Sequence, residues 1–237
     1  MRARRLCVAL AAAGLCVVPA ASVSEAGSVR VRQLVALGYD DGAVSDPGTG
    51  RVHVRVDGRR CAVAGGTALA ALVRSEVSGL RLRDFGSCSS RSRDGGGLFV
   101  TSLLGLRNKG ERGWVYKVGT KAATAGAADV SGPFGRGRLR AGAKIVWFYC
   151  RSASNCQRTL ATRVRVEEGG TVAVRVTSYD DAGRGRPAAG AEVVTRDAVL
   201  ITDADGLERT RLPSGTHVVS ARQRGLVPSL PEKVKVP

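Results

Sequence analysis

Beyond its first 26 residues, this chain shows helical periodicity in one segment only, and short strand-like runs make up most of the rest. In that segment, Ala68–Val77, apolar side chains recur at the spacing of one helix face. Thr67 is a favoured N-cap residue, and Gly79 favours a helix end. A chain with so little helix must bury its apolar side chains against sheets, so we expect a largely β protein.

The first 26 residues have the three parts of a secretory signal peptide. Three arginines among the first five residues form a basic start, and an apolar run follows. Ser24-x-Ala26 offers a small-residue cleavage site. The apolar run is shorter than the roughly 20 residues that cross a bilayer. We therefore expect residues 1–26 to be removed and the chain to be secreted, extracellular and associated with the cell surface.

Four cysteines follow the expected signal peptide: Cys61, Cys88, Cys150 and Cys156. An even number of cysteines in an exported chain predicts disulfide bonds, and four cysteines allow three connectivities. We favour Cys61–Cys88 and Cys150–Cys156, because each pair closes a short loop. A zinc site would need a close Cys-x-x-Cys pair or a histidine cluster, and the sequence has neither.

The chain is strongly basic, with 37 Lys and Arg against 20 Asp and Glu and a formal charge of +17. Without residues 1–26 the balance is 34 minus 19, or +15. Such a charge attracts anionic polymers, including those of a cell wall. The basic residues are scattered rather than gathered in one tail, so we expect no specific nucleic-acid partner, and a merely solvated basic surface is the alternative.

Residues 27–158 combine the single helix with several strand-like runs, and aromatic residues mark two of these runs. One helix packed across a mixed sheet of four or five strands is an α+β layout, and this element order suits a β-grasp. The strands are expected at Val31–Leu37, Val52–Val56, Leu80–Phe85, Leu98–Leu106, Trp114–Val118 and Lys144–Cys150.

Residues 159–237 contain no cysteine, no tryptophan and no helical segment. Short strands that recur every 8–12 residues predict an all-β second domain, a seven-stranded β-sandwich. The strands are expected at Leu160–Val166, Thr171–Tyr179, Ala191–Thr195, Val199–Thr202, Leu207–Leu212, Thr216–Arg222 and Glu232–Val236.

Four motifs in the first half occur in the order found in a known domain. They are Gly66–Leu72, Leu98–Gly105, Gly113–Val118 and Leu139–Tyr149. With them, residues 50–150 resemble the C-terminal β-grasp domain of transcobalamin-like proteins. The resemblance implies a corrinoid ligand, held in such proteins between an α/α-barrel and this domain. This chain has no such barrel, so a separate α/α-barrel protein or surface protein would have to supply the other half of the site.

The second half resembles Ig-like, prealbumin-like sandwiches of the carboxypeptidase-regulatory-like and collagen-adhesin B-type families. The segments that carry the resemblance are Gly190–Val193, Thr202–Gly206, Leu212–Ala221 and Glu232–Val236. In those families such modules serve as stalks and spacers. The resemblance therefore implies that this half spaces or docks the first.

Aromatic residues are only 4% of the chain, yet four of them lie on two expected strands. Trp114 and Tyr116 share one face of their strand, with Lys117 on the other, and Trp147 and Tyr149 share a face of theirs. These five residues are the candidate ligand-binding site, with the aromatic faces lining an apolar pocket and the lysine near an anionic group. The alternative is that the aromatic side chains fill the core.

No arrangement of residues predicts catalysis or a bound metal. The chain has two histidines and no Gly-x-Ser-x-Gly motif. Asp203, Asp205 and Gly206 match part of a calcium loop but lack its further ligands, so we interpret them as a turn. We expect that the protein is not an enzyme and that it has no cofactor apart from a corrinoid.

We expect an exported binding or adaptor protein for a small hydrophobic or corrinoid ligand. The alternative is a surface spacer that binds anionic wall polymer.

Overall fold

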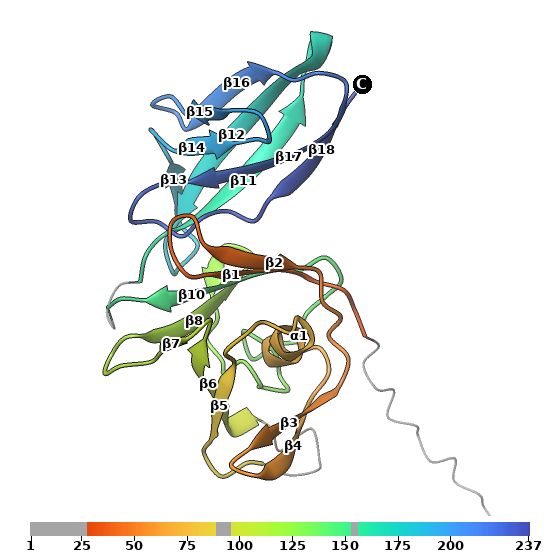
Figure 1. Cartoon of the computed structure of the whole chain (residues 1–237), viewed down its shortest axis with the longest axis vertical. Coiled ribbons are helices and arrows are strands. Elements are labelled where there is room, and N and C mark those ends of the chain that lie inside the picture. The colour runs from red at the N-terminus through yellow and green to blue at the C-terminus, as the bar shows by residue number, and fades with distance from the viewer. Residues whose placement is uncertain (1–27, 89–95, 153–155) are drawn as a thin grey trace, which may run out of the picture.

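A computed structural model describes residues 28–88, 96–152 and 156–237. The expected signal peptide and its cleavage site lie outside these residues. The described chain is largely β-structure with one α-helix, as the sequence predicts (Figure 1). Within it, no helix is long and apolar enough to cross a membrane.

A five-stranded mixed sheet forms the centre of the first half. Its strand order is β2-β1-β10-β8-β9, in which β1 runs parallel to β10 and the other pairs are antiparallel. The strands are β1 (Arg32–Ala36), β2 (Gly42–Ser45), β8 (Gly113–Val118), β9 (Lys121–Ala122) and β10 (Lys144–Cys150).

The single helix, α1 (Ala68–Arg74), packs against one face of this sheet (Figure 1). Its start is as predicted, because the Thr67 hydroxyl accepts a hydrogen bond from the Ala70 amide at 3.1 Å. Its predicted end at Val77 is wrong. Ser75 caps the helix, and Glu76 has a φ of 54°, a left-handed conformation in which the helix cannot continue.

Two smaller sheets cover the other side of α1. One is a hairpin of β3 (Val52–Val56) and β4 (Arg59–Val63), joined at the Asp57-Gly58 turn. The other has three strands, β5 (Arg81–Asp84), β6 (Leu98–Leu103) and β7 (Leu106–Arg107). The Cys61–Cys88 disulfide ties the hairpin to the segment after β5. The second favoured pairing, Cys150–Cys156, is also present.

The second half consists of two four-stranded sheets. In one, β12 pairs with β11 on one side and with β13 and β16 on the other, and the second has the order β15-β14-β17-β18. All seven predicted strands are present, and β13 and a short 3-10 helix, η2 (Glu168–Gly170), were not predicted. The strands are β11 (Thr159–Val166), β12 (Thr171–Tyr179), β13 (Gly185–Pro187), β14 (Glu192–Val194), β15 (Val199–Ile201), β16 (Leu207–Arg211), β17 (Gly215–Arg222) and β18 (Glu232–Val236).

Buried apolar side chains form three clusters. The first lies around α1, and the second contains side chains from both sheets of the second half. The third, here called the junction cluster, joins the two halves. It contains Leu34 and Ala36 of β1, Val146 and Phe148 of β10, and Val227 and Leu230 from the segment between β17 and β18. The main sheet is therefore covered on both faces, by α1 on one and by the second half on the other.

Candidate functional site

The four predicted aromatic residues lie together on the α1 side of the main sheet. Tyr116 is opposite Trp147 in the β8–β10 register, and Trp114 is opposite Tyr149. The Tyr116 and Trp147 rings stack with centroids 4.9 Å apart, and the other two rings meet edge to face at 6.0 Å. Trp114, Tyr116 and Trp147 are buried, and Tyr149 is half-buried. The sequence thus predicts correctly which of these residues share a face.

The polar atoms of these four side chains are already bonded within the chain. Burial, with a smaller effect of the Asp129 charge, raises the pKa of the Tyr116 hydroxyl, so this group stays neutral. What these residues can offer a ligand is therefore ring surface rather than free donors. The acceptors are the Leu106 carbonyl for Trp114 (2.8 Å), the Ala125 carbonyl for Tyr116 (3.0 Å), the Gln33 side chain for Trp147 (3.2 Å) and the Arg107 carbonyl for Tyr149 (3.0 Å).

Lys117, the fifth predicted site residue, points to the opposite face of the sheet and is fully buried at the junction. Its Nζ donates to the carbonyls of Tyr179 (3.1 Å) and Asp180 (3.0 Å) and forms an ion pair with the Asp181 carboxylate at 3.1 Å. Burial lowers the pKa of Lys117, and the hydrogen bond and charge of Asp181 partly oppose this effect. The structure therefore places Lys117 on the face opposite the four predicted aromatic residues, where it binds the second half of the chain and lies 5.8 Å from the centre of the Phe148 ring.

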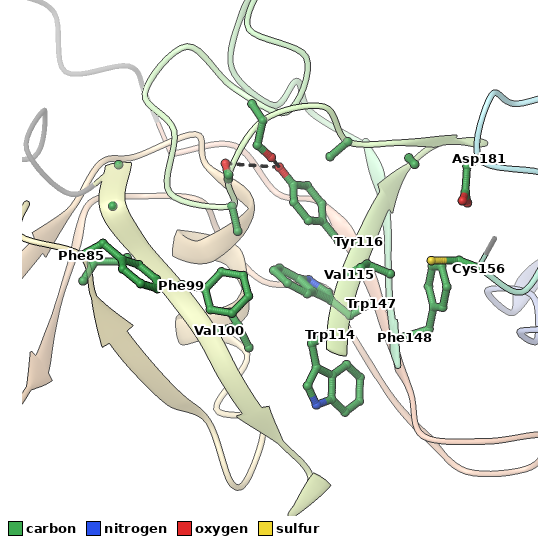
Figure 2. A pocket seen from close by; sticks show the side chains of 18 residues that line it. Phe85, Phe99, Val100, Trp114, Val115, Tyr116, Trp147, Phe148, Cys156 and Asp181 are labelled. Carbon is green, nitrogen blue, oxygen red and sulfur yellow. Dashed lines mark hydrogen bonds between the residues drawn. The ribbon is translucent and has the colours of Figure 1, made fainter. Parts of the chain in front are cut away.

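An apolar cavity of about 360 Å³ lies beside the aromatic residues, where the first part of β8 has no neighbouring strand on its outer side (Figure 2). Trp114, Tyr116 and Trp147 line it, whereas Tyr149 and Lys117 do not. Residues of β6 and of the segment after β9 also line it. In Figure 2, Phe85 and Phe99 lie on one side of Trp147, and Phe148, Cys156 and Asp181 lie on the other.

Phe85 and Phe99 are cavity residues that the sequence analysis missed. Their side chains meet edge to face at 6.1 Å, and they are 64% and 46% exposed. The guanidinium of Arg83 lies 5.1 Å from the centre of the Phe85 ring. A signal was available, because Phe99 stands at an outward position between Leu98 and Val100 of β6, both of which are buried. Soluble proteins seldom expose large apolar patches, and such patches commonly mark binding sites. Two exposed phenylalanines at one cavity therefore favour a binding role.

The cavity has the size and surface of a site for a small apolar molecule. Its volume lies at the lower end of the range for ligand pockets, and exceeds the roughly 150 Å³ cavity that holds one benzene ring. Among the residues that the structure describes, Asp181 is the only charged residue in its lining, and its carboxylate is paired with Lys117. Across the described ranges, no three His, Cys, Asp or Glu residues are placed to hold a metal ion.

Comparison with family models, curated proteins and solved structures finds no match to this chain.

Proposed function

We propose that this protein is an exported, non-catalytic binding protein that holds a small apolar ring molecule in the cavity beside β8. One observation carries the proposal. Three buried aromatic side chains form the inner wall of a 360 Å³ cavity, and two exposed phenylalanines lie at its solvent side. When a flat apolar molecule covers aromatic surface that is open to a cavity, apolar area is removed from water and the free energy of the system falls.

The size of the cavity favours a molecule of two or three rings. The cavity has somewhat more than twice the volume that accommodates benzene, and its lining offers few unpaired polar groups. Because a corrinoid is a macrocycle, it would extend beyond this cavity. A corrinoid ligand therefore requires additional surface, such as that of a separate α/α-barrel protein.

We further propose that the first half, residues 27–158, is a β-grasp domain and that residues 159–237 form an Ig-like β-sandwich that supports it. The single helix against a five-stranded mixed sheet favours the first assignment. Two four-stranded sheets that share one buried cluster favour the second. Two disulfide bonds favour an oxidising compartment, which agrees with export by residues 1–26.

The fluorescent probe N-phenyl-1-naphthylamine, an uncharged molecule of three rings, tests the proposal. We expect its fluorescence to rise on binding and to saturate at one molecule per chain. The double variant Phe85→Ala/Phe99→Ala should bind it at least 10-fold more weakly, a loss of about 1.4 kcal/mol. Because both side chains are largely exposed, the variant should melt within about 3 °C of the parent chain.

The matched control is Val199→Ala/Ile201→Ala, which removes two exposed apolar side chains from β15 of the second half. It should leave the probe affinity unchanged. A second variant, Ala123→Leu, places a larger side chain in the cavity lining and should abolish binding. Equal losses in the phenylalanine variant and the control, or no saturable binding by the parent chain, would refute the proposal.

A further inference from the structure

A second cavity lies in the first half, away from the aromatic site, and arginines line it. It is a groove of about 580 Å³ between the β3–β4 hairpin and the β5–β6–β7 sheet. Arg55 of β3, Arg81 of β5 and Arg107 of β7 all line this groove, and all three are exposed. Apart from these arginines, Asp57 at the β3–β4 turn is the only charged residue in the lining within the described parts of the chain. The groove thus carries three positive charges against one negative charge.

The strand register shows that two of these arginines lie near each other. Arg81 is opposite Ser102 of β6, and Ser102 is opposite Arg107. Ser102 therefore lies between the two arginines in one row across the sheet, next to an irregularity in the β5–β6 register between Arg81 and Leu82. At a spacing of about 4.8 Å between strands, the two arginine backbones lie roughly 10 Å apart. The small, buried Ser102 between them leaves room for a ligand between the guanidinium groups.

No interaction within the described ranges explains the position of these arginines. Among the residues that the structure describes, no carboxylate pairs with their guanidinium groups and no acceptor bonds to them. Arg55 is in addition directly opposite Arg60 in the hairpin, a placement of like charges that destabilises a strand pair. By contrast, Arg32 and Arg222 at the junction both pair with carboxylates. The groove arginines therefore add repulsion to the folded chain, and a bound anion would relieve it.

We propose that this groove is a binding site for a molecule that carries several linked phosphate groups. Guanidinium groups bind phosphate oxygens through paired, charge-assisted hydrogen bonds. A phosphate group has oxygens that point in several directions, so it can accept from arginines on both walls of the groove, which a planar carboxylate does less well. Arg81 and Arg107 both line the groove, and their long side chains can converge on one short phosphate chain. This site does not depend on the apolar cavity.

Tripolyphosphate is the probe, and isothermal titration calorimetry on the whole chain at low ionic strength is the measurement. We expect saturable binding at one molecule per chain. The double variant Arg81→Gln/Arg107→Gln should weaken that binding at least 10-fold. Because both side chains are exposed, the variant should keep the circular dichroism spectrum and melting temperature of the parent chain. It should also keep the affinity for N-phenyl-1-naphthylamine.

The control removes the same charge elsewhere. Arg163→Gln/Arg165→Gln changes two exposed arginines on β11 of the second half and should lower the affinity less than twofold. If both double variants weaken tripolyphosphate binding equally, the attraction is diffuse and the proposed site is wrong. Citrate, a tricarboxylate of similar size, distinguishes the ligand chemistry. Binding of citrate as tight as that of tripolyphosphate, or no binding of tripolyphosphate, would also overturn the assignment.

Discussion

Gln33 shows how a single buried polar side chain connects the main sheet to the helix. It lies on β1 and is fully buried. Its side-chain oxygen accepts from Trp147 Nε1 at 3.2 Å, and its nitrogen donates to the Ser75 hydroxyl at 2.9 Å. That hydroxyl in turn donates to the Leu72 carbonyl at 2.7 Å in the last turn of α1. Gln33 therefore fixes the tryptophan that forms part of the cavity wall and the end of the helix above it.

Replacing Gln33 with leucine tests this role. The Gln33→Leu variant would leave the buried Trp147 Nε1 without its acceptor, and an unsatisfied buried donor costs about 1–3 kcal/mol. We expect the free energy of unfolding, measured with urea, to fall by that amount. The control Gln223→Leu removes one exposed hydrogen bond to the Ala189 carbonyl and should change it by less than about 0.5 kcal/mol. Equal effects of the two substitutions would show that Gln33 has no such role.

At the scale of elements, local signals predict where most strands and the helix begin. Thr67 marks the start of α1, and the alternation in Trp114–Val118 and Lys144–Cys150 locates β8 and β10. The strand β4 was missed, although the Asp57-Gly58 turn after β3 favours a hairpin partner. Its residues, Arg59–Val63, alternate poorly because the last three are all buried. Local patterns fail where a strand is covered on both faces.

The candidate site shows a second limit of sequence reasoning. Alternation shows that Lys117 lies on the face opposite Trp114 and Tyr116, but it cannot show what covers each face. The second half of the chain covers the Lys117 face through contacts from Tyr179 to Asp181, which are about 60 residues away in sequence. The cavity likewise depends on Phe99 of β6 and on Phe85 just after β5, and these two strands belong to a different sheet. Such long-range packing leaves no local pattern.

The two disulfide bonds should stabilise the chain unequally, because they close loops of different length. In the chain-entropy view, the Cys61–Cys88 bond, with a sequence separation of 27, contributes about 3.5 kcal/mol. The Cys150–Cys156 bond, with a separation of 6, contributes about 2.2 kcal/mol. Replacing each pair by serines and measuring urea unfolding should give this order. A larger loss from the second pair would contradict it.

At the scale of the whole molecule, the two halves are held by an apolar junction with charged groups around it. Phe148 and the other members of the junction cluster are buried there, beside the fully buried Lys117. Around them, Glu232 accepts from Arg32 at 2.8 Å and from Lys144 at 2.5 Å. Arg222 pairs with both Asp40 and Glu192. The second half thus packs against one face of the main sheet, and the aromatic residues of the candidate site lie on the opposite face.

Acidification should weaken this junction through Glu232. Its burial alone would raise the pKa of the carboxyl group, but the hydrogen bonds and charges of Lys144 and Arg32 outweigh burial, and the net shift is downward. A carboxyl group whose pKa is lowered by folding stabilises the folded chain at pH values above the ordinary glutamate pKa of about 4.3. This contribution is lost as the pH falls through the folded-state pKa.

The Glu232→Gln variant measures that contribution. At pH 7 it should be less stable than the parent chain by about 1–2 kcal/mol, since two partly exposed ion pairs are lost. That corresponds to a melting temperature lower by several degrees. In scanning calorimetry from pH 7 to pH 3, the difference between the two chains should shrink. A difference that stays constant over this range would contradict the assigned role of Glu232.

The central claim is that a small apolar ring molecule binds against Trp114 and Trp147, the only two tryptophans of the chain. The most direct measurement is the tryptophan emission during titration with N-phenyl-1-naphthylamine, whose absorption accepts energy from excited indole. We predict saturable quenching with a matching rise in probe emission, lost in the Ala123→Leu variant and kept in Val199→Ala/Ile201→Ala. Probe emission without tryptophan quenching, or quenching that survives Ala123→Leu, would contradict the account.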